Sequence, residues 1–227
     1  MVNVSNATID RNQITTQGNN QSHAISLHGN GGGTVSNTII TGNTITTTGS
    51  NGEGMYLHAN GGMIRNTTIT GNTVEAVNFN SDGIFLRADG GGTLSGAIVA
   101  NNTVTTAGTA ARGIFVSTQN STLNDVMVAG NTVTTTGPND AIGDSTGVFL
   151  RSNANGMLRD VTVVGNTLST AGNLAQGIFV FIDVLPRIND GGFWVQTAIA
   201  GVARLILPRP MDNALPIRCS PRNFTSR

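Results

Sequence analysis

The stretch Gly42-Asn43-Thr44-Ile45-Thr46-Thr47-Thr48-Gly49 decides the fold, because close copies of it recur along most of the chain. The copies align on an asparagine, which stands at Asn12, Asn43, Asn72, Asn102, Asn131 and Asn166. The steps between these asparagines are 31, 29, 30, 29 and 35 residues. A repeat of about 20–50 residues is typical of solenoids and other repeat architectures. The sequence therefore predicts a stack of similar coils.

Each repeat contains three short apolar runs at nearly constant offsets. The first run has the form of residues 54–57 (GMYL) and 83–86 (GIFL). Within the runs apolar and polar residues alternate, β-branched residues are abundant, and Gly or Asn separates one run from the next, which indicates strands and turns. Residues equivalent to Ile45 and Val74 are expected to point inward, and neighbours such as Thr44 outward.

One coil buries too few aliphatic side chains to offset the entropy lost when its backbone is ordered. Stacked coils share backbone hydrogen bonds with the coils above and below, at about 4.8 Å per step. The predicted fold is therefore all-β: a parallel β-helix with three short strands in each coil of about 30 residues. The repeated asparagines are expected to form a ladder at one corner, because Asn tolerates tight turns and its amide bonds to the amide one coil away.

The composition excludes several classes of protein. The formal net charge is zero, which gives no reason to expect nucleic-acid binding. Cys219 is the only cysteine, so no internal disulfide forms. No window approaches 18 apolar residues, so no membrane span is expected. Because the chain starts inside the repeat without a signal peptide, we expect it to continue upstream repeats of a longer exported protein.

The pattern predicts a division into β-helix repeats at 1–183 and an irregular tail at 184–227. The tail contains five of the six prolines and the only tryptophan. Apolar residues at Val195, Ile199 and Val202 predict a short amphipathic helix within 193–207, ending before Pro208. This helix would cap the open end of the core. The alternative is that the tail is unrelated to the repeats.

The runs GIFL, GMYL, GNTI and GNTV at this spacing resemble the right-handed parallel β-helix repeats of bacterial secreted and surface proteins. These include pectate-lyase-like proteins and autotransporter passengers. The resemblance covers residues 4–180 and rests on core and corner positions. It implies a right-handed coil and an extracellular or cell-surface location, and it is not specific for an activity.

Two outward columns are candidate ligand-binding surfaces. The first is an aromatic column on the outer face, expected to stack on sugar rings, to pair with another chain or to be covered by the C-terminal tail: Tyr56, Phe85, Phe115, Phe149 and Phe179. The alternative is aromatic stacking that only stiffens the sheet. The second is a weakly cationic column that would attract anionic sugars: His28, His58, Arg87 and Arg151, with Ser117 between the arginines. The alternative for this column is a solvated face.

One further row lies just before the first strand of each coil: His23, Glu53, Asp82 and Arg112. It is either an acid/base set or an exposed ladder of ion pairs. The other carboxylates are scattered, whereas a lyase or glycosidase clusters them on one face. No third ligand accompanies the two histidines of the cationic column, so no metal is predicted, and no cofactor is implied.

These patterns favour a noncatalytic, adhesin- or stalk-like module that presents outer columns and loops to carbohydrate or to a host or neighbouring surface protein. Whether the chain is an enzyme stays open. The first alternative is a polysaccharide lyase or glycoside hydrolase of the pectate-lyase-like type. The second is an ice-binding solenoid, suggested by outward Thr-x-Thr pairs such as Thr44/Thr46 and Thr103/Thr105, although Glu75 interrupts their column.

Overall fold

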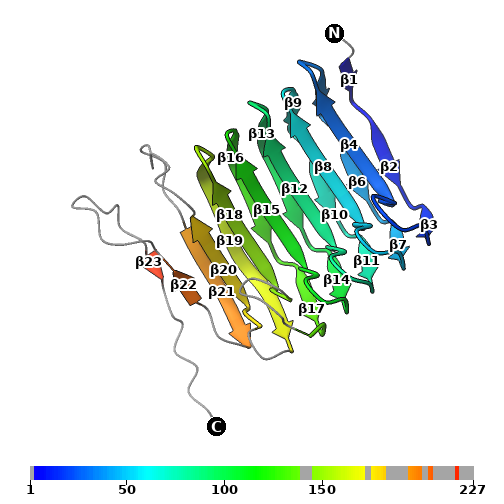
Figure 1. The fold of residues 1–227 in the computed structure, drawn as a ribbon, viewed down its shortest axis with the longest axis vertical. Helices are drawn as coiled ribbons and strands as arrows, with labels where there is room; N and C mark the ends of the chain where they lie inside the picture. The colour runs from blue at the N-terminus through cyan, green and yellow to red at the C-terminus, as the bar shows by residue number, and fades with distance from the viewer. Residues whose placement is uncertain are drawn as a thin grey trace.

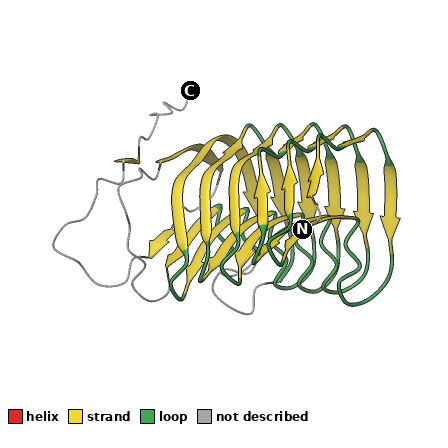
Figure 2. Ribbon diagram, turned by 90° about the horizontal axis from the view of Figure 1, so that it is seen from above, coloured by secondary structure: helices red, strands yellow, loops and turns green. Residues whose placement is uncertain are grey.

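The computed structural model describes residues 3–138, 145–171 and 175–182, together with strands at 194–200, 204–206 and 218–219. These residues form a right-handed parallel β-solenoid, as predicted, and its strands stack side by side from the N-terminus towards the C-terminus (Figure 1). Figure 2 shows the successive coils joined by loops at their corners. No described segment is a helix long and apolar enough to cross a membrane.

The first apolar run of each repeat builds a seven-stranded sheet. Its strands, in spatial order, are β4 (Ile25–Asn30), β8 (Met55–Asn60), β12 (Ile84–Asp89), β15 (Ile114–Gln119), β18 (Val148–Asn153), β20 (Ile178–Ile182) and β22 (Arg204–Ile206). Neighbouring strands are parallel and paired residue for residue, so that Phe85 lies opposite both Tyr56 and Phe115. This register turns equivalent positions of the repeat into straight columns.

The second and third runs build a sixteen-stranded sheet around the rest of each coil. Its strands in the first coils are β1 (Asn3–Ser5), β2 (Thr8–Asp10), β3 (Gln13–Thr16), β5 (Thr34–Ser36), β6 (Ile39–Thr41), β7 (Thr44–Thr47), β9 (Met63–Arg65), β10 (Thr68–Thr70) and β11 (Thr73–Ala76). In later coils the runs merge into longer strands: β13 (Thr93–Ala100), β14 (Thr103–Thr106), β16 (Thr122–Ala129), β17 (Thr132–Thr135) and β19 (Met157–Thr170). All strand pairs in this sheet are parallel among the described residues.

The core is a single column of aliphatic side chains between the two sheets. The residues predicted to point inward from the third run are at most 1% exposed: Ile45, Val74, Val104, Val133 and Leu168. Ile84 and Leu86 of the first run are fully buried in the same cluster. The predicted inward and outward alternation is therefore confirmed for these strands.

The predicted helix within 193–207 is wrong. Residues 194–200 form strand β21 (Trp194–Ala200), which pairs in parallel with β19, and Val195 lies in register with Val163. Strand β22 pairs with β20, and β23 (Arg218–Cys219) pairs with β21. The apolar residues of this segment fit both a helical and a strand period, and the open edge of β19 supplies backbone partners that favour a strand. The rest of 184–227 lies outside the described residues.

Candidate functional site

The asparagine ladder occupies one corner of the solenoid. Each Asn side chain donates from Nδ2 to Oδ1 of the next: Asn12 to Asn43 at 2.9 Å, Asn43 to Asn72 at 2.9 Å, Asn72 to Asn102 at 2.9 Å, Asn102 to Asn131 at 3.0 Å and Asn131 to Asn166 at 2.8 Å. The residue before the ladder Asn has a positive φ, for example Gly42 (65°) and Asn101 (55°), which explains why Gly or Asn recurs there. These amides are used within the fold and offer little to a ligand.

The aromatic column projects from the outer face of the seven-stranded sheet and forms a cluster separate from the core. The prediction that its rings are exposed is wrong, because Tyr56 is only 9% exposed and Phe179 only 1%. Phe115 stacks on Phe85 at 4.4 Å and on Phe149 at 5.0 Å between ring centroids, with nearly parallel planes. The two faces of the Phe115 ring are therefore covered by other rings, and no sugar can stack on them. The sequence did not reveal that the guanidinium of Arg112 lies over the rings of Phe115 and Phe149, 4.7 and 5.6 Å from their centroids.

The row before the first strand is ordered as predicted but is not exposed. His23 Nδ1 contacts Glu53 Oε2 and accepts a hydrogen bond from the backbone N–H of Glu53 at 3.2 Å. The backbone N–H of Arg112 donates to Asp82 Oδ1 at 2.7 Å, and Arg112 Nη1 lies 3.5 Å from the same oxygen. The Asp82 side chain is 3% exposed. Burial raises the pKa of Asp82 to about 6, the cation of Arg112 opposes this shift, and the charge of Glu53 adds to it.

The cationic column lies on the other side of the aromatic rings, and each of its members pairs with a neighbouring polar group. His58 Nε2 and Arg87 Nη2 each lie 2.8 Å from a carboxylate oxygen of Asp89. Arg151 donates from Nε to Asn153 Oδ1 at 2.9 Å. Burial, with the charges of the other two histidines, lowers the pKa of His28. The column is thus an organised polar surface and not a set of freely solvated side chains.

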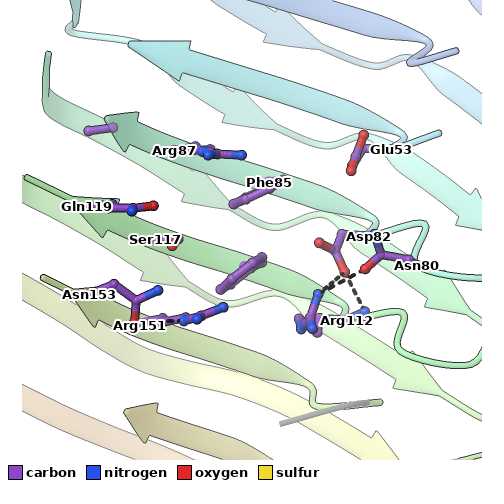
Figure 3. Close-up of a pocket in the computed structure, with 12 residues that line it drawn as sticks. Glu53, Asn80, Asp82, Phe85, Arg87, Arg112, Ser117, Gln119, Arg151 and Asn153 are labelled. Carbon is purple, nitrogen blue, oxygen red and sulfur yellow. Dashed lines mark hydrogen bonds and ion pairs between the residues drawn. The ribbon is translucent and has the colours of Figure 1, made fainter. Parts of the chain in front are cut away.

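A groove of about 280 Å³ lies between these two rows (Figure 3). One wall consists of residues from the turns before the strands: Glu53, Asn80, Asp82 and Arg112. The other wall consists of outward residues of the strands and their ends: Arg87, Ser117, Gln119, Arg151 and Asn153. The rings of Phe85 and Phe115 lie between the walls. The groove is therefore polar on both sides and has an apolar floor of ring edges.

The groove includes some of the predicted ligand-binding residues and leaves out others. Phe85, Phe115, Arg87 and Arg151 line it. The remaining members of the two predicted columns lie outside its lining: Tyr56, Phe149, Phe179, His28 and His58. The sequence analysis gave no ligand role to the amides of Asn80, Gln119 and Asn153. The repeat could have indicated two of them, since Gln119 and Asn153 occupy equivalent positions at the ends of β15 and β18.

The Thr-x-Thr pairs lie in register on the outer surface of the sixteen-stranded sheet. Thr44, Thr103 and Thr132 are exposed members of one column. Glu75 lies between Thr46 and Thr105 in the neighbouring column. A charged side chain therefore interrupts the array that an ice-binding surface would require.

The architecture defines a parallel β-solenoid, and residues 1–183 match the family described as the right-handed beta helix region. The chain belongs to this family. No curated protein and no solved structure gave a significant match. Among the described residues, no group of three or more His, Cys, Asp or Glu side chains is arranged to hold a metal ion.

The raised pKa of Asp82 gives a testable dependence of stability on pH. The ordinary value for this carboxyl is 3.8, whereas the folded value is about 6. Between these pH values the folded protein binds more protons than the unfolded chain, so the free energy of unfolding falls as pH rises. We expect a loss of about 2–3 kcal/mol from pH 4 to pH 7 that is absent in Asp82→Asn. Urea unfolding at several pH values measures it.

The matched control for this measurement is Asp125→Asn, which changes an exposed carboxyl in a backbone conformation that asparagine tolerates. This variant should retain the pH dependence of the unsubstituted protein. Equal pH slopes for the unsubstituted protein and Asp82→Asn would contradict the assignment of the proton to Asp82.

Proposed function

We propose that the protein is a noncatalytic, adhesin- or stalk-like module, extracellular or at the cell surface, that binds a carbohydrate chain in the groove of the seven-stranded sheet. The observation that carries this proposal is the groove itself, with polar walls on both sides of an apolar floor. Its volume lies near the lower limit of about 300 Å³ for small-molecule pockets. A rigid β-solenoid fixes these walls at constant spacing.

The chemistry of the walls suits sugar hydroxyl groups. The side-chain amide of Gln119 supplies donors and an acceptor, which match hydroxyls that both donate and accept. Asn80 and Asn153 each keep part of this capacity, because Asn80 Nδ2 also donates to Asn51 Oδ1 and Asn153 Oδ1 accepts from Arg151 Nε. The ring edges of Phe85 and Phe115 supply a small apolar surface for the C–H groups of a sugar. The lining extends from the turn before β8 to β18, three strand steps or about 14 Å, which favours an elongated ligand.

A polysaccharide lyase or glycoside hydrolase is the second candidate, and the state of Asp82 is the observation that favours it. A carboxyl group that keeps its proton up to about pH 6 is suited to act as a general acid. Asp82 lies on the groove wall together with Glu53, which would be the second carboxylate of a glycosidase pair. The contacts of Glu53 with His23 favour the noncatalytic proposal, because they restrain Glu53.

A binding screen with product analysis tests both candidates. The protein is applied to an array of neutral and acidic glycans, and soluble polysaccharides are incubated with it and analysed for shortened or unsaturated products. We expect binding without products, and Gln119→Ala should weaken the best glycan about three- to tenfold because one or two hydrogen bonds are lost.

Thr105→Ala, on the sixteen-stranded sheet away from the groove, is the control and should bind as the unsubstituted protein does. Absence of binding to every glycan would overturn the proposal. Product formation that Asp82→Asn abolishes would establish the enzyme instead.

A further inference from the structure

One position of the aromatic column carries a hydroxyl group in place of a ring. Ser26 on β4 lies in register with Tyr56 on β8, where the cluster of rings begins. The side chains of Ser26 and of His28, two positions further along β4, are both exposed. His28 Nε2 lies 2.6 Å from Ser26 Oγ. A serine hydroxyl within hydrogen-bond reach of an imidazole has the geometry of a nucleophile and its general base.

The imidazole of His28 is in the charge state that accepts a proton. Burial and the charges of His58 and His23 lower the pKa of His28 from its ordinary value of 6.5, so the ring is neutral at pH 7. With its own proton on Nδ1, the neutral ring accepts the hydrogen bond from Ser26 Oγ–H at Nε2. The nearest carboxylate on β12, Asp89, is engaged with His58 and Arg87.

Neighbouring rings hold the imidazole of His28 in place. It meets the rings of Tyr56 and His58 edge-on, with centroids 5.6 Å away in both cases. His58 is itself fixed, because its Nε2 lies 2.8 Å from Asp89 Oδ1. These contacts restrict rotation of the His28 ring and keep Nε2 directed at Ser26. A further group that orients the base is the usual complement of a nucleophile and base pair.

We propose that Ser26 is an acyl-accepting nucleophile, with His28 as its base, and that it takes the acyl group of a small carboxylic ester. Ser26 Oγ forms a bond to the ester carbonyl carbon while its proton passes to His28 Nε2. The bond from that carbon to the alkoxy oxygen then breaks, and the leaving oxygen takes the proton from His28. The products are O-acylated Ser26 and an alcohol, and His28 is neutral again.

This modification site is separate from the groove, because neither Ser26 nor His28 lines it. The proposal therefore goes beyond carbohydrate binding, and a failure to bind glycans would leave its test unaffected. Both side chains lie on an open sheet face outside the groove. A short acyl chain on a good leaving group suits such a face better than a long chain, which needs a pocket to bury it.

The test uses two probes at pH 7: p-nitrophenyl acetate, which transfers an acetyl group, and a fluorophosphonate, which phosphonylates activated serines. Mass spectrometry of the intact chain counts the groups added, and peptide fragmentation locates them. We expect one group per chain, added to Ser26 at least tenfold faster than to Ser169, an exposed serine on β19. Equal rates at the two serines would overturn the proposal.

Substitutions separate the nucleophile from the base. Ser26→Ala should abolish the modification, and His28→Gln should slow it at least tenfold because the base is lost. Ser169→Ala is the matched control and should react as the unsubstituted protein does. Melting temperatures verify that each variant is folded. Acetylation that persists on His28 in Ser26→Ala would make histidine the nucleophile and refute the role of Ser26.

The pH profile of the fluorophosphonate reaction distinguishes a base from a merely structural histidine. As His28 loses its proton below pH 6.5, the rate should rise with pH, and it should level off near pH 7. His28→Gln should lack this rise and plateau. If both proteins instead react about tenfold faster for each pH unit up to pH 9, Ser26 reacts without His28 and the proposed pair is wrong.

Discussion

Asn102→Ala is expected to lower the free energy of unfolding by about 3–5 kcal/mol. The Asn102 side chain lies in the middle of the ladder and is 1% exposed. Its Nδ2 donates to Asn131 Oδ1 at 3.0 Å and to Ile69 O at 2.9 Å. Its Oδ1 accepts from the backbone N and from Nδ2 of Asn72. Alanine leaves these partners buried without hydrogen bonds, and each such group costs about 1–3 kcal/mol.

Urea unfolding followed by circular dichroism measures this loss. Thr103→Ala changes the next residue, whose side chain is exposed, and should cost less than about 1 kcal/mol. Asn12→Ala should cost less than Asn102→Ala, because Asn12 is exposed at the end of the ladder. Similar losses for Asn102→Ala and Thr103→Ala would show that the ladder contributes little to stability.

Phe115→Ala is also expected to lower the free energy of unfolding by about 3–5 kcal/mol. Phe115 is 5% exposed and lies between Phe85 and Phe149 in the stack. The guanidinium of Arg112 also lies over its ring, 4.7 Å from the centroid. The substitution therefore removes ring contacts on both faces and opens a cavity below the groove.

The control is Phe79→Ala, since the Phe79 side chain is 52% exposed and should contribute less than about 0.5 kcal/mol. Phe115→Leu keeps most of the volume and should cost less than about 1.5 kcal/mol. Thermal unfolding of the three variants ranks them. A small loss for Phe115→Ala would mean that the aromatic column does not stiffen the sheet.

Most of the fold could be predicted from the sequence, because in a solenoid the period of the sequence is also the period of the structure. The spacing of Asn43, Asn72 and Asn102 defines the coil, and alternation around Ile45 defines which side chains point inward. A single regular pattern of this kind leaves few other ways to bury the aliphatic residues. Beyond residue 183 the repeat no longer constrains the prediction. The segment Trp194–Ala200 was therefore predicted as a helix, whereas it forms a strand.

The candidate site was predicted only in part, because a column can be predicted from the register while its burial depends on the lengths of neighbouring side chains. The position of Phe85 and Phe115 outside the core followed from period two. Their burial depends on long side chains such as Arg87 and Arg112, which lie on either side of the rings. The groove depends on the short side chain of Ser117. In a sequence rich in serine and threonine, one such residue does not stand out as part of a site.

The ladder also gives its corner of the solenoid a chemical direction. Every side-chain amide from Asn12 to Asn131 donates towards the C-terminal coil, so the amide dipoles add head to tail along the corner. At Asn166 the side-chain N–H groups are donated to the backbone carbonyls of Val128 and Val164. The polarity of the ladder is therefore set by the direction of the chain, because each coil presents its asparagine amide in the same orientation.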